Sequence, residues 1–152
     1  MTARSRVLAR MGLVVALLFV GASWAQDRKP FVVLPTGEAQ AVNRLCSRTG
    51  PKVEGGWSPK ARDIEALEAR LGDIKSERHG AISDPFRSYR QYVGIVVAGR
   101  RLIYVNAFPP QVSLKAWKTR LVSVCDGGPS FWGIQFDPAD DKFFDLEMNG
   151  FA

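Results

Sequence analysis

Alternating apolar and polar positions predict two β-hairpins in the second half of the chain. Residues 87–108 alternate with a period of two, and Ala98-Gly99-Arg100-Arg101 interrupts them in the manner of a connection between antiparallel strands. Toward the C-terminus, two further alternating runs flank the turn Asp137-Pro138-Ala139-Asp140-Asp141. The apolar positions of those two runs are Trp132, Ile134, Phe136, Phe144, Leu146 and Met148.

A period of three to four residues predicts the main helix ahead of these hairpins. Ser58 is suited to cap its N-terminus, Pro59 to its first position and Gly72 to its end. Shorter helices are predicted at 38–48 and 114–121. These elements predict an α+β fold: an antiparallel sheet of about four strands in two hairpins, with one main helix packed on one face. The apolar face of the main helix consists of Ile64, Leu67 and Leu71.

The first 25 residues have the pattern of an export signal. Three arginines precede the apolar stretch 11–20, and Ser23-Trp24-Ala25 matches the small-x-small cleavage pattern. The segment 11–25 is shorter than the roughly 20 residues that a spanning helix needs, so we expect no stable membrane anchor. We expect cleavage before Gln26, a single domain over 26–152, and a secreted or periplasmic protein.

Composition narrows the class of partner only slightly. The chain has 21 basic and 15 acidic residues, and loss of three arginines with the signal leaves 18 against 15, a net charge of +3. Such a balance is not typical of a nucleic-acid-binding protein. Two cysteines, Cys46 and Cys125, remain in a chain sent to an oxidising compartment, so we expect them to form an intramolecular disulfide.

Few residues suit the commoner kinds of catalysis. The one histidine, His79, rules out a two-histidine metal site, and we expect it to be dispensable. The sequence has no nucleophile elbow, phosphate-binding loop or dinucleotide fingerprint. We therefore expect no cofactor, no metal and no catalytic residue, although a pair of carboxylates brought together by the fold remains an alternative. The aspartates of the turn 137–141 lack the spacing of a calcium loop and are typical of a hairpin turn.

Charge is segregated along the chain. Residues 85–125 carry seven basic and no acidic side chains, whereas residues 126–152 carry six acids and one lysine. Either the two hairpins pair these charges within one sheet, or the basic hairpin binds an acidic protein or an anionic cell-envelope polymer. The tyrosines between the arginines support the second reading, because Tyr and Arg are enriched at interfaces. The predicted binding residues are Arg90, Tyr92, Arg100, Arg101 and Tyr104, with Asp126, Gly127 and Gly128 in a loop beside Cys125.

One short stretch is similar to a known family. Val96-Val97-Ala98-Gly99, at a hairpin preceded by a helix, resembles the Gln-Val-Val-Ala-Gly hairpin of cystatin-type cysteine-protease inhibitors, with Ile95 in the glutamine position. The resemblance implies that residues 96–99 enter a protease cleft as a tight, uncleaved loop. Our main expectation is broader: an exported, non-enzymatic inhibitor or immunity-like protein of the cell-envelope space that binds a protein with an acidic surface. A small envelope enzyme that uses carboxylates is the other alternative.

Overall fold

The structure, a computed structural model, describes residues 30–74, 82, 84–110 and 116–150. The predicted signal segment 1–25, His79 and the first residues of the predicted helix 114–121 lie outside the described residues. Within the described ranges, no helix is long and apolar enough to cross a membrane.

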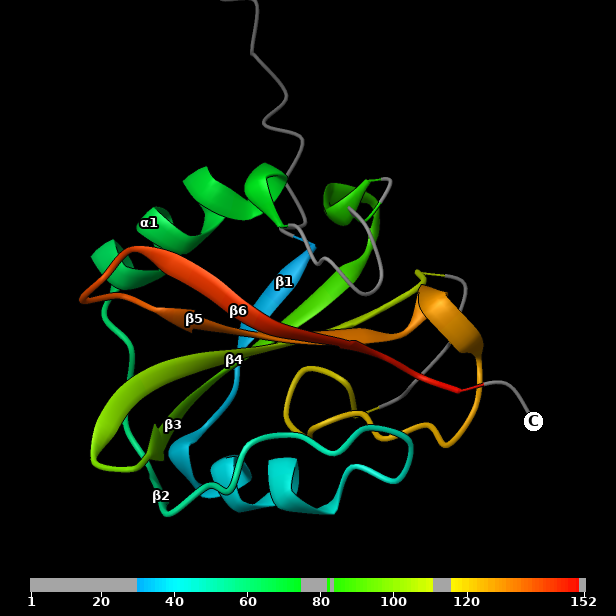
Figure 1. Cartoon of the computed structure of the whole chain (residues 1–152), viewed down its shortest axis with the longest axis horizontal. Coiled ribbons are helices and arrows are strands. Elements are labelled where there is room, and N and C mark those ends of the chain that lie inside the picture. Colours follow the sequence, from blue (N-terminus) through cyan, green and yellow to red (C-terminus); the bar gives the residue numbers. More distant parts are fainter. Residues whose placement is uncertain (1–29, 75–81, 83, 111–115, 151–152) are drawn as a thin grey trace, which may run out of the picture.

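Six strands form one mixed sheet (Figure 1). Four of them, β3 to β6, run as an antiparallel meander, which confirms both predicted hairpins. The short β1 adds to β3 in parallel, with Phe31 opposite Arg90, and β2 pairs antiparallel with the other end of β3. The α+β class is therefore confirmed, but the purely antiparallel four-strand sheet was wrong. The strands are β1 (Phe31–Val33), β2 (Gly55–Gly56), β3 (Tyr89–Val97), β4 (Arg100–Phe108), β5 (Trp132–Asp137) and β6 (Lys142–Met148).

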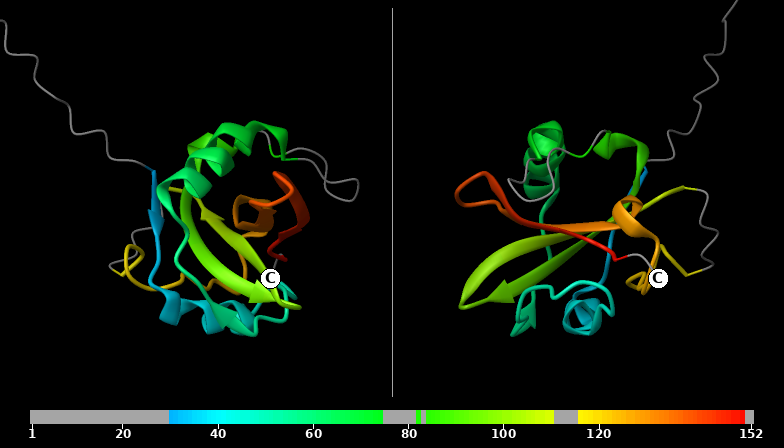
Figure 2. Two further views of the ribbon diagram at one scale, coloured as in Figure 1. Left: turned by 90° about the vertical axis from the view of Figure 1, so that its left-hand side faces the viewer. Right: turned by 45° about the vertical axis from the view of Figure 1, so that its right-hand side comes forward.

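The tips of both hairpins lie at the same end of the sheet (Figure 2). Only two residues connect β3 to β4, Ala98 with φ 48° and Gly99 with φ 73°. Two consecutive positive φ angles are the geometry of the tight turn that matches strand twist. The connection is thus shorter than the predicted one, and Arg100 and Arg101 already belong to β4.

The main helix, α1 (Ala61–Arg70), covers one face of the sheet (Figure 1). It begins two residues after the predicted start, and the backbone N–H of Lys60 donates to Asp63 Oδ2 at 2.8 Å. A short 3-10 helix, η2 (Leu71–Asp73), continues its path. The apolar residues predicted for the helix are buried against the sheet as part of a core that comprises Ile64, Leu67, Leu71, Ile74, Tyr92, Ile103, Val105, Ala107, Trp132, Ile134, Phe136 and Leu146.

The opposite face is covered by less regular structure. The 3-10 helix η1 (Thr36–Arg44) lies there and ends before Cys46, where the predicted helix was to continue. Residues 116–120, part of the second short predicted helix, form turns instead. The predicted disulfide between Cys46 and Cys125 is present, with a Cα–Cα distance of 5.1 Å, and joins the two covering segments.

Buried polar side chains fasten this second cover to the sheet. Arg48 Nη2 donates to Asn106 Oδ1 at 2.6 Å, and Asn106 Nδ2 donates to Gln91 Oε1 at 2.9 Å. In turn, Gln91 Nε2 donates to the carbonyl of Arg120 at 2.6 Å, and Gln91 Oε1 accepts from the backbone N–H of Val122 at 2.8 Å. These bonds satisfy backbone groups that an irregular segment could not pair by itself.

Candidate functional site

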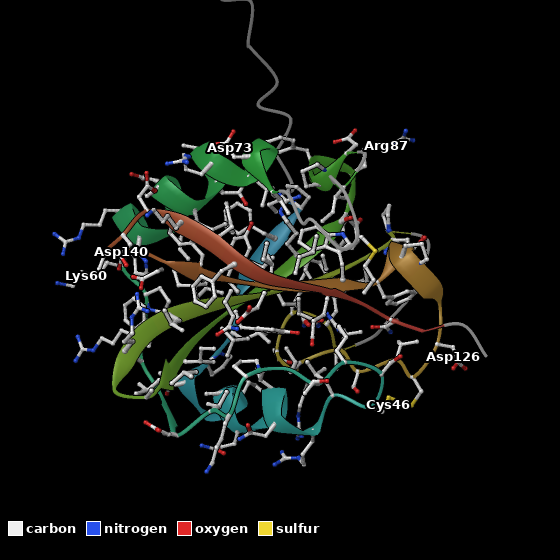
Figure 3. All side chains as sticks on the ribbon, in the orientation of Figure 1. Cys46, Lys60, Asp73, Arg87, Asp126 and Asp140 are labelled. Carbon is white, nitrogen blue, oxygen red and sulfur yellow. A yellow bond between two sulfur atoms is a disulfide. The ribbon has the colours of Figure 1, made fainter. Side chains whose placement is uncertain are left out.

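A cleft of about 410 Å³ opens where the two hairpin tips meet the start of α1. It brings together residues from three separate parts of the chain. Figure 3 shows two of these residues, Lys60 and Asp140, side by side at one end of the molecule. We call this site the tip cleft. It is lined by Trp57, Lys60, Arg62, Asp63, Arg100, Arg101, Asp137, Pro138, Ala139 and Asp140.

Trp57 reaches the tip cleft because β3 carries a glycine at its middle. A Cβ atom on Gly94 would lie 2.0 Å from the Trp57 carbonyl oxygen and 2.8 Å from Pro59 Cδ, so the segment packs directly on the strand backbone. The Trp57 N–H donates to the Gly94 carbonyl at 3.1 Å, and the indole Nε1 donates to the Leu102 carbonyl at 2.8 Å. These contacts fix the indole across β3 and β4.

Arg100 is engaged by the acidic hairpin turn. Its Nη2 donates to both Asp137 Oδ2 and Asp140 Oδ2, the latter at 2.9 Å. The Asp137 side chain is only 4% exposed, so Arg100 neutralises a nearly buried carboxylate. The other side of the turn is held by α1, because Arg70 Nη1 contacts Asp141 Oδ2 at 2.5 Å. Arg100 therefore pairs with acidic residues of the same protein, which is the first of the two readings of the charge segregation.

Arg101 and Lys60 are the exposed cations of the tip cleft without an acidic partner among the described residues. The Arg101 guanidinium carbon lies over the Trp57 ring, 5.9 Å from its centroid. Both side chains belong to exposed residues. A third cation, Arg62, lies 3.6 Å from its neighbour Asp63. Cations over an aromatic face keep their hydrogen-bond donors available at the ring edge.

The structure places Arg90 and Tyr92 inside the protein. Arg90 was predicted to bind a partner, but it pairs with Ala107 at the end of β3 away from the hairpin turn, and it is only 1% exposed. Its Nε donates to Tyr92 Oη at 2.9 Å, and its Nη2 lies 3.2 Å from Glu68 Oε2 of α1. Burial raises the pKa of Tyr92 well above its ordinary value. Neither residue is accessible to a partner in the folded protein.

Tyr104 is also interior, on the opposite face of the sheet. It is 2% exposed, and its hydroxyl and Arg48 Nη1 have no hydrogen-bond partner among the described residues. Both atoms lie above Gly133, where a Cβ would be 2.1 Å from Tyr104 Oη and 2.4 Å from Arg48 Nη1. Burial raises the pKa of Tyr104 to about 12, whereas the nearby Arg48 lowers it, and burial lowers the pKa of Arg48.

Replacing Tyr104 by Phe should make the protein less sensitive to alkaline pH. An unfolded tyrosine loses its proton near pH 10, before the folded one does, so the wild-type protein loses stability as the pH rises from about 10 through 12. Relative to Tyr104→Phe, we expect an additional loss of roughly 2 to 3 kcal/mol over that range. Urea unfolding of both proteins at pH 7 and at several values above pH 9.5 measures it. Parallel pH profiles of the two proteins would contradict the assignment.

The predicted loop Asp126, Gly127 and Gly128 lies at the opposite end of the sheet from the tip cleft. Figure 3 shows Asp126 beside Cys46, far from Lys60 and Asp140. Asn149 Nδ2 donates to the carbonyls of Val124 and Asp126, which holds the loop to the chain after β6. Asp126 and Gly127 are exposed and Gly128 is buried. The hairpin tip and this loop therefore do not form one continuous surface.

Comparison of the chain with protein-family models, with curated proteins and with solved structures found no match. The class defined by the structure is thus an α+β domain with a mixed sheet and one disulfide. Among the described residues, no group of three or more His, Cys, Asp or Glu is arranged to hold a metal ion. The turn aspartates are divided between Arg100 and Arg70.

Proposed function

We propose that this protein is an exported binding protein that uses the tip cleft to engage an acidic protein, as an inhibitor or immunity-like protein would. The observation that carries the proposal is a pair of exposed cations, Lys60 and Arg101, in a concave site that is also lined by the fixed indole of Trp57. Exposed charges that pair with nothing inside the protein contribute to association with a partner of opposite charge.

The mixed lining of the tip cleft favours a protein over a uniformly anionic polymer. Asp63 and Asp140 line the same cleft as Lys60 and Arg101. A polymer with a negative charge on every unit would meet these carboxylates as well as the cations, and like charges at an interface oppose binding. A protein surface can place its acidic groups at the cations alone.

The disulfide supports the exported part of the proposal. The disulfide between Cys46 and Cys125 is consistent with an oxidising, extracellular compartment, where such bonds persist. Both cysteines are exposed, so cytosolic reductants would have access to them.

Reversing these two exposed cations should weaken partner binding without affecting the fold. We expect Lys60→Glu/Arg101→Glu to bind a captured partner at least about tenfold more weakly, with the larger loss at low salt, because screening already weakens exposed charges at high salt. The partner is captured from the envelope and culture-medium fractions of the source organism with the tagged wild-type protein, and its affinity for each variant is measured by titration calorimetry.

The matched control is Arg44→Glu/Lys52→Glu, which makes the same change in net charge at exposed positions on the other cover of the sheet. It should bind as the wild type does, and both variants should retain the wild-type melting temperature. Equal binding by the two double variants would overturn the proposal. Arg100 is unsuitable for this experiment, because its reversal would oppose the nearly buried Asp137 and destabilise the protein.

An alternative function, which does not depend on Lys60 and Arg101, is inhibition of a cysteine protease by the β3–β4 tip. Ala98 and Gly99 form an exposed turn, and the β5–β6 tip lies at the same end of the sheet. In that case, the mature protein inhibits papain, and the Lys60→Glu/Arg101→Glu variant inhibits it as well as the wild type does. Absence of papain inhibition at micromolar concentrations rules this form out.

A further inference from the structure

We propose that Arg101, held by Trp57, is the residue that selects carboxylate groups on the partner, and that Lys60 contributes charge only. This inference rests on the proposed function, because it names the chemistry that the tip cleft recognises. It distinguishes two cations that have the same charge and a similar exposure. The difference between them is the support that each receives from the protein.

Both the main chain and the side chain of Trp57 are held by the sheet. Its main chain is bonded to β3 through the Gly94 carbonyl, its indole N–H is bonded to the Leu102 carbonyl, and its carbonyl rests where Gly94 has no side chain. The ring packs against the edge of the α1-side core. The indole is therefore a rigid support at the wall of the cleft, and its one N–H donor is already used.

Arg101 lies on this support, and its side-chain donors have no hydrogen-bond partner among the described residues. The guanidinium carbon is 5.9 Å from the Trp57 ring centroid, and no carboxylate among the described residues pairs with it. A planar guanidinium that is oriented before binding loses less conformational freedom when it grips a carboxylate with two parallel hydrogen bonds. Lysine cannot make that bidentate contact, because its ammonium group acts as a point charge.

Lys60 has no comparable support. It precedes the first residue of α1, and its backbone N–H donates to Asp63. Its side chain has no ion-pair partner in the part of the chain that the structure describes, and no aromatic ring there supports it. The side chain attracts an anion without imposing a geometry on it. An arginine at this position should therefore serve as well as the lysine.

The ligand class that follows is the side-chain carboxylate of Asp or Glu in an exposed segment of the partner. Arg100 beside it cannot take this role, because Asp137 and Asp140 already occupy its Nη2. Asp63 and Asp140 also line the cleft and limit access by densely charged polymers. One carboxylate at Arg101 and a second anionic group near Lys60 match the two unpaired cations.

The experiment uses an end-capped peptide of four alternating Glu-Ala pairs as the probe, with binding to the mature, oxidised protein measured by calorimetry. Arg101→Lys, which keeps the charge, should weaken binding by about tenfold, and Lys60→Arg should change it by less than about twofold. Trp57→Leu should also weaken binding. Its effect should not add to that of Arg101→Lys in the double variant, because Trp57 acts through Arg101.

The binding of the variants shows whether this inference fails alone or together with the proposed function. If Arg101→Lys binds the peptide as the wild type does while Lys60→Glu/Arg101→Glu does not, charge alone is recognised and this inference is wrong, but the proposed function stands. If Lys60→Glu/Arg101→Glu binds as the wild type does, both are wrong. Heparin provides the third arm: tight binding that Arg101→Lys leaves unchanged would identify a site for sulfated polymers and overturn carboxylate selection.

Discussion

Replacing both cysteines by serine should lower the free energy of unfolding by about 4.5 kcal/mol, which is the entropic cost of closing a loop of this length in the unfolded chain. Cys46 and Cys125 are 79 positions apart, and the loop between them contains α1 and the whole first hairpin. A loss of this size is a large share of the stability of a single domain. Guanidinium unfolding of the mature wild type and Cys46→Ser/Cys125→Ser measures the difference.

The same experiment has an internal control. Wild-type protein unfolded in the presence of a reductant should match the serine variant, whereas the variant should be indifferent to the reductant. Before reduction, the folded wild type should not react with a thiol reagent. Uptake of two equivalents of the reagent by the native protein would contradict the role assigned to the disulfide. Coincident unfolding curves for the wild type and the serine variant in the absence of reductant would contradict it as well.

Arg90→Ala should be the most destabilising replacement of a charged residue, with a loss of about 3 kcal/mol. The Arg90 side chain is 1% exposed and donates to three backbone carbonyls in the segment that precedes β3, as well as to Tyr92 and Glu68. Its removal takes this donor from the Phe86 and Ser88 carbonyls and from the Glu68 carboxylate. We expect a loss of stability at the lower end of the range for breaking a buried ion pair, because Glu68 is 24% exposed and can still be hydrated. The carbonyls belong to Pro85, Phe86 and Ser88.

Arg87→Ala is the matched control, since Arg87 is an exposed arginine in the adjacent 3-10 helix η3 (Pro85–Arg87). It should change the free energy of unfolding by less than about 0.5 kcal/mol. Arg90→Lys should fall between the two, because an ammonium group keeps the charge but cannot reach all of the acceptors. Chemical denaturation in 0.15 M salt compares the three variants, and equal stability of Arg87→Ala and Arg90→Ala would contradict the buried role.

The parts of the fold that could be predicted from the sequence are those whose pattern is local. The two hairpins follow from the alternation of side chains, and α1 follows from its helical spacing. The same alternation contained the correct position of Arg90, which shares a strand face with the buried Tyr92. Its charge led to the opposite expectation, because arginine is rarely buried unless it is paired, and the pairing with Glu68 depends on tertiary structure.

The tip cleft depends on contacts that no local pattern shows. Trp57, Lys60 and Arg62 were not among the predicted binding residues, since the sequence around them indicates only the start of a helix. The available signal was Gly94 in the middle of β3, a position that often marks a close approach of another backbone. What approaches could not be inferred, because Trp57 and Gly94 are far apart in the sequence. The parallel β1 could not be predicted for a similar reason, because three apolar residues can pair with either edge of a sheet.

The two edges of the sheet restrict how a partner can bind. At one edge, β1 and β2 divide the length of β3 between them. At the other, β6 has one more residue than β5 between their paired positions, with Asp145 at φ 54° and the charged Lys142 and Glu147 on either side. A bulged, charged edge and an interrupted one both resist the addition of a foreign strand. A partner of this domain would therefore contact its side chains and would not add a strand to the sheet, and edge-to-edge pairing of two copies is disfavoured at both edges.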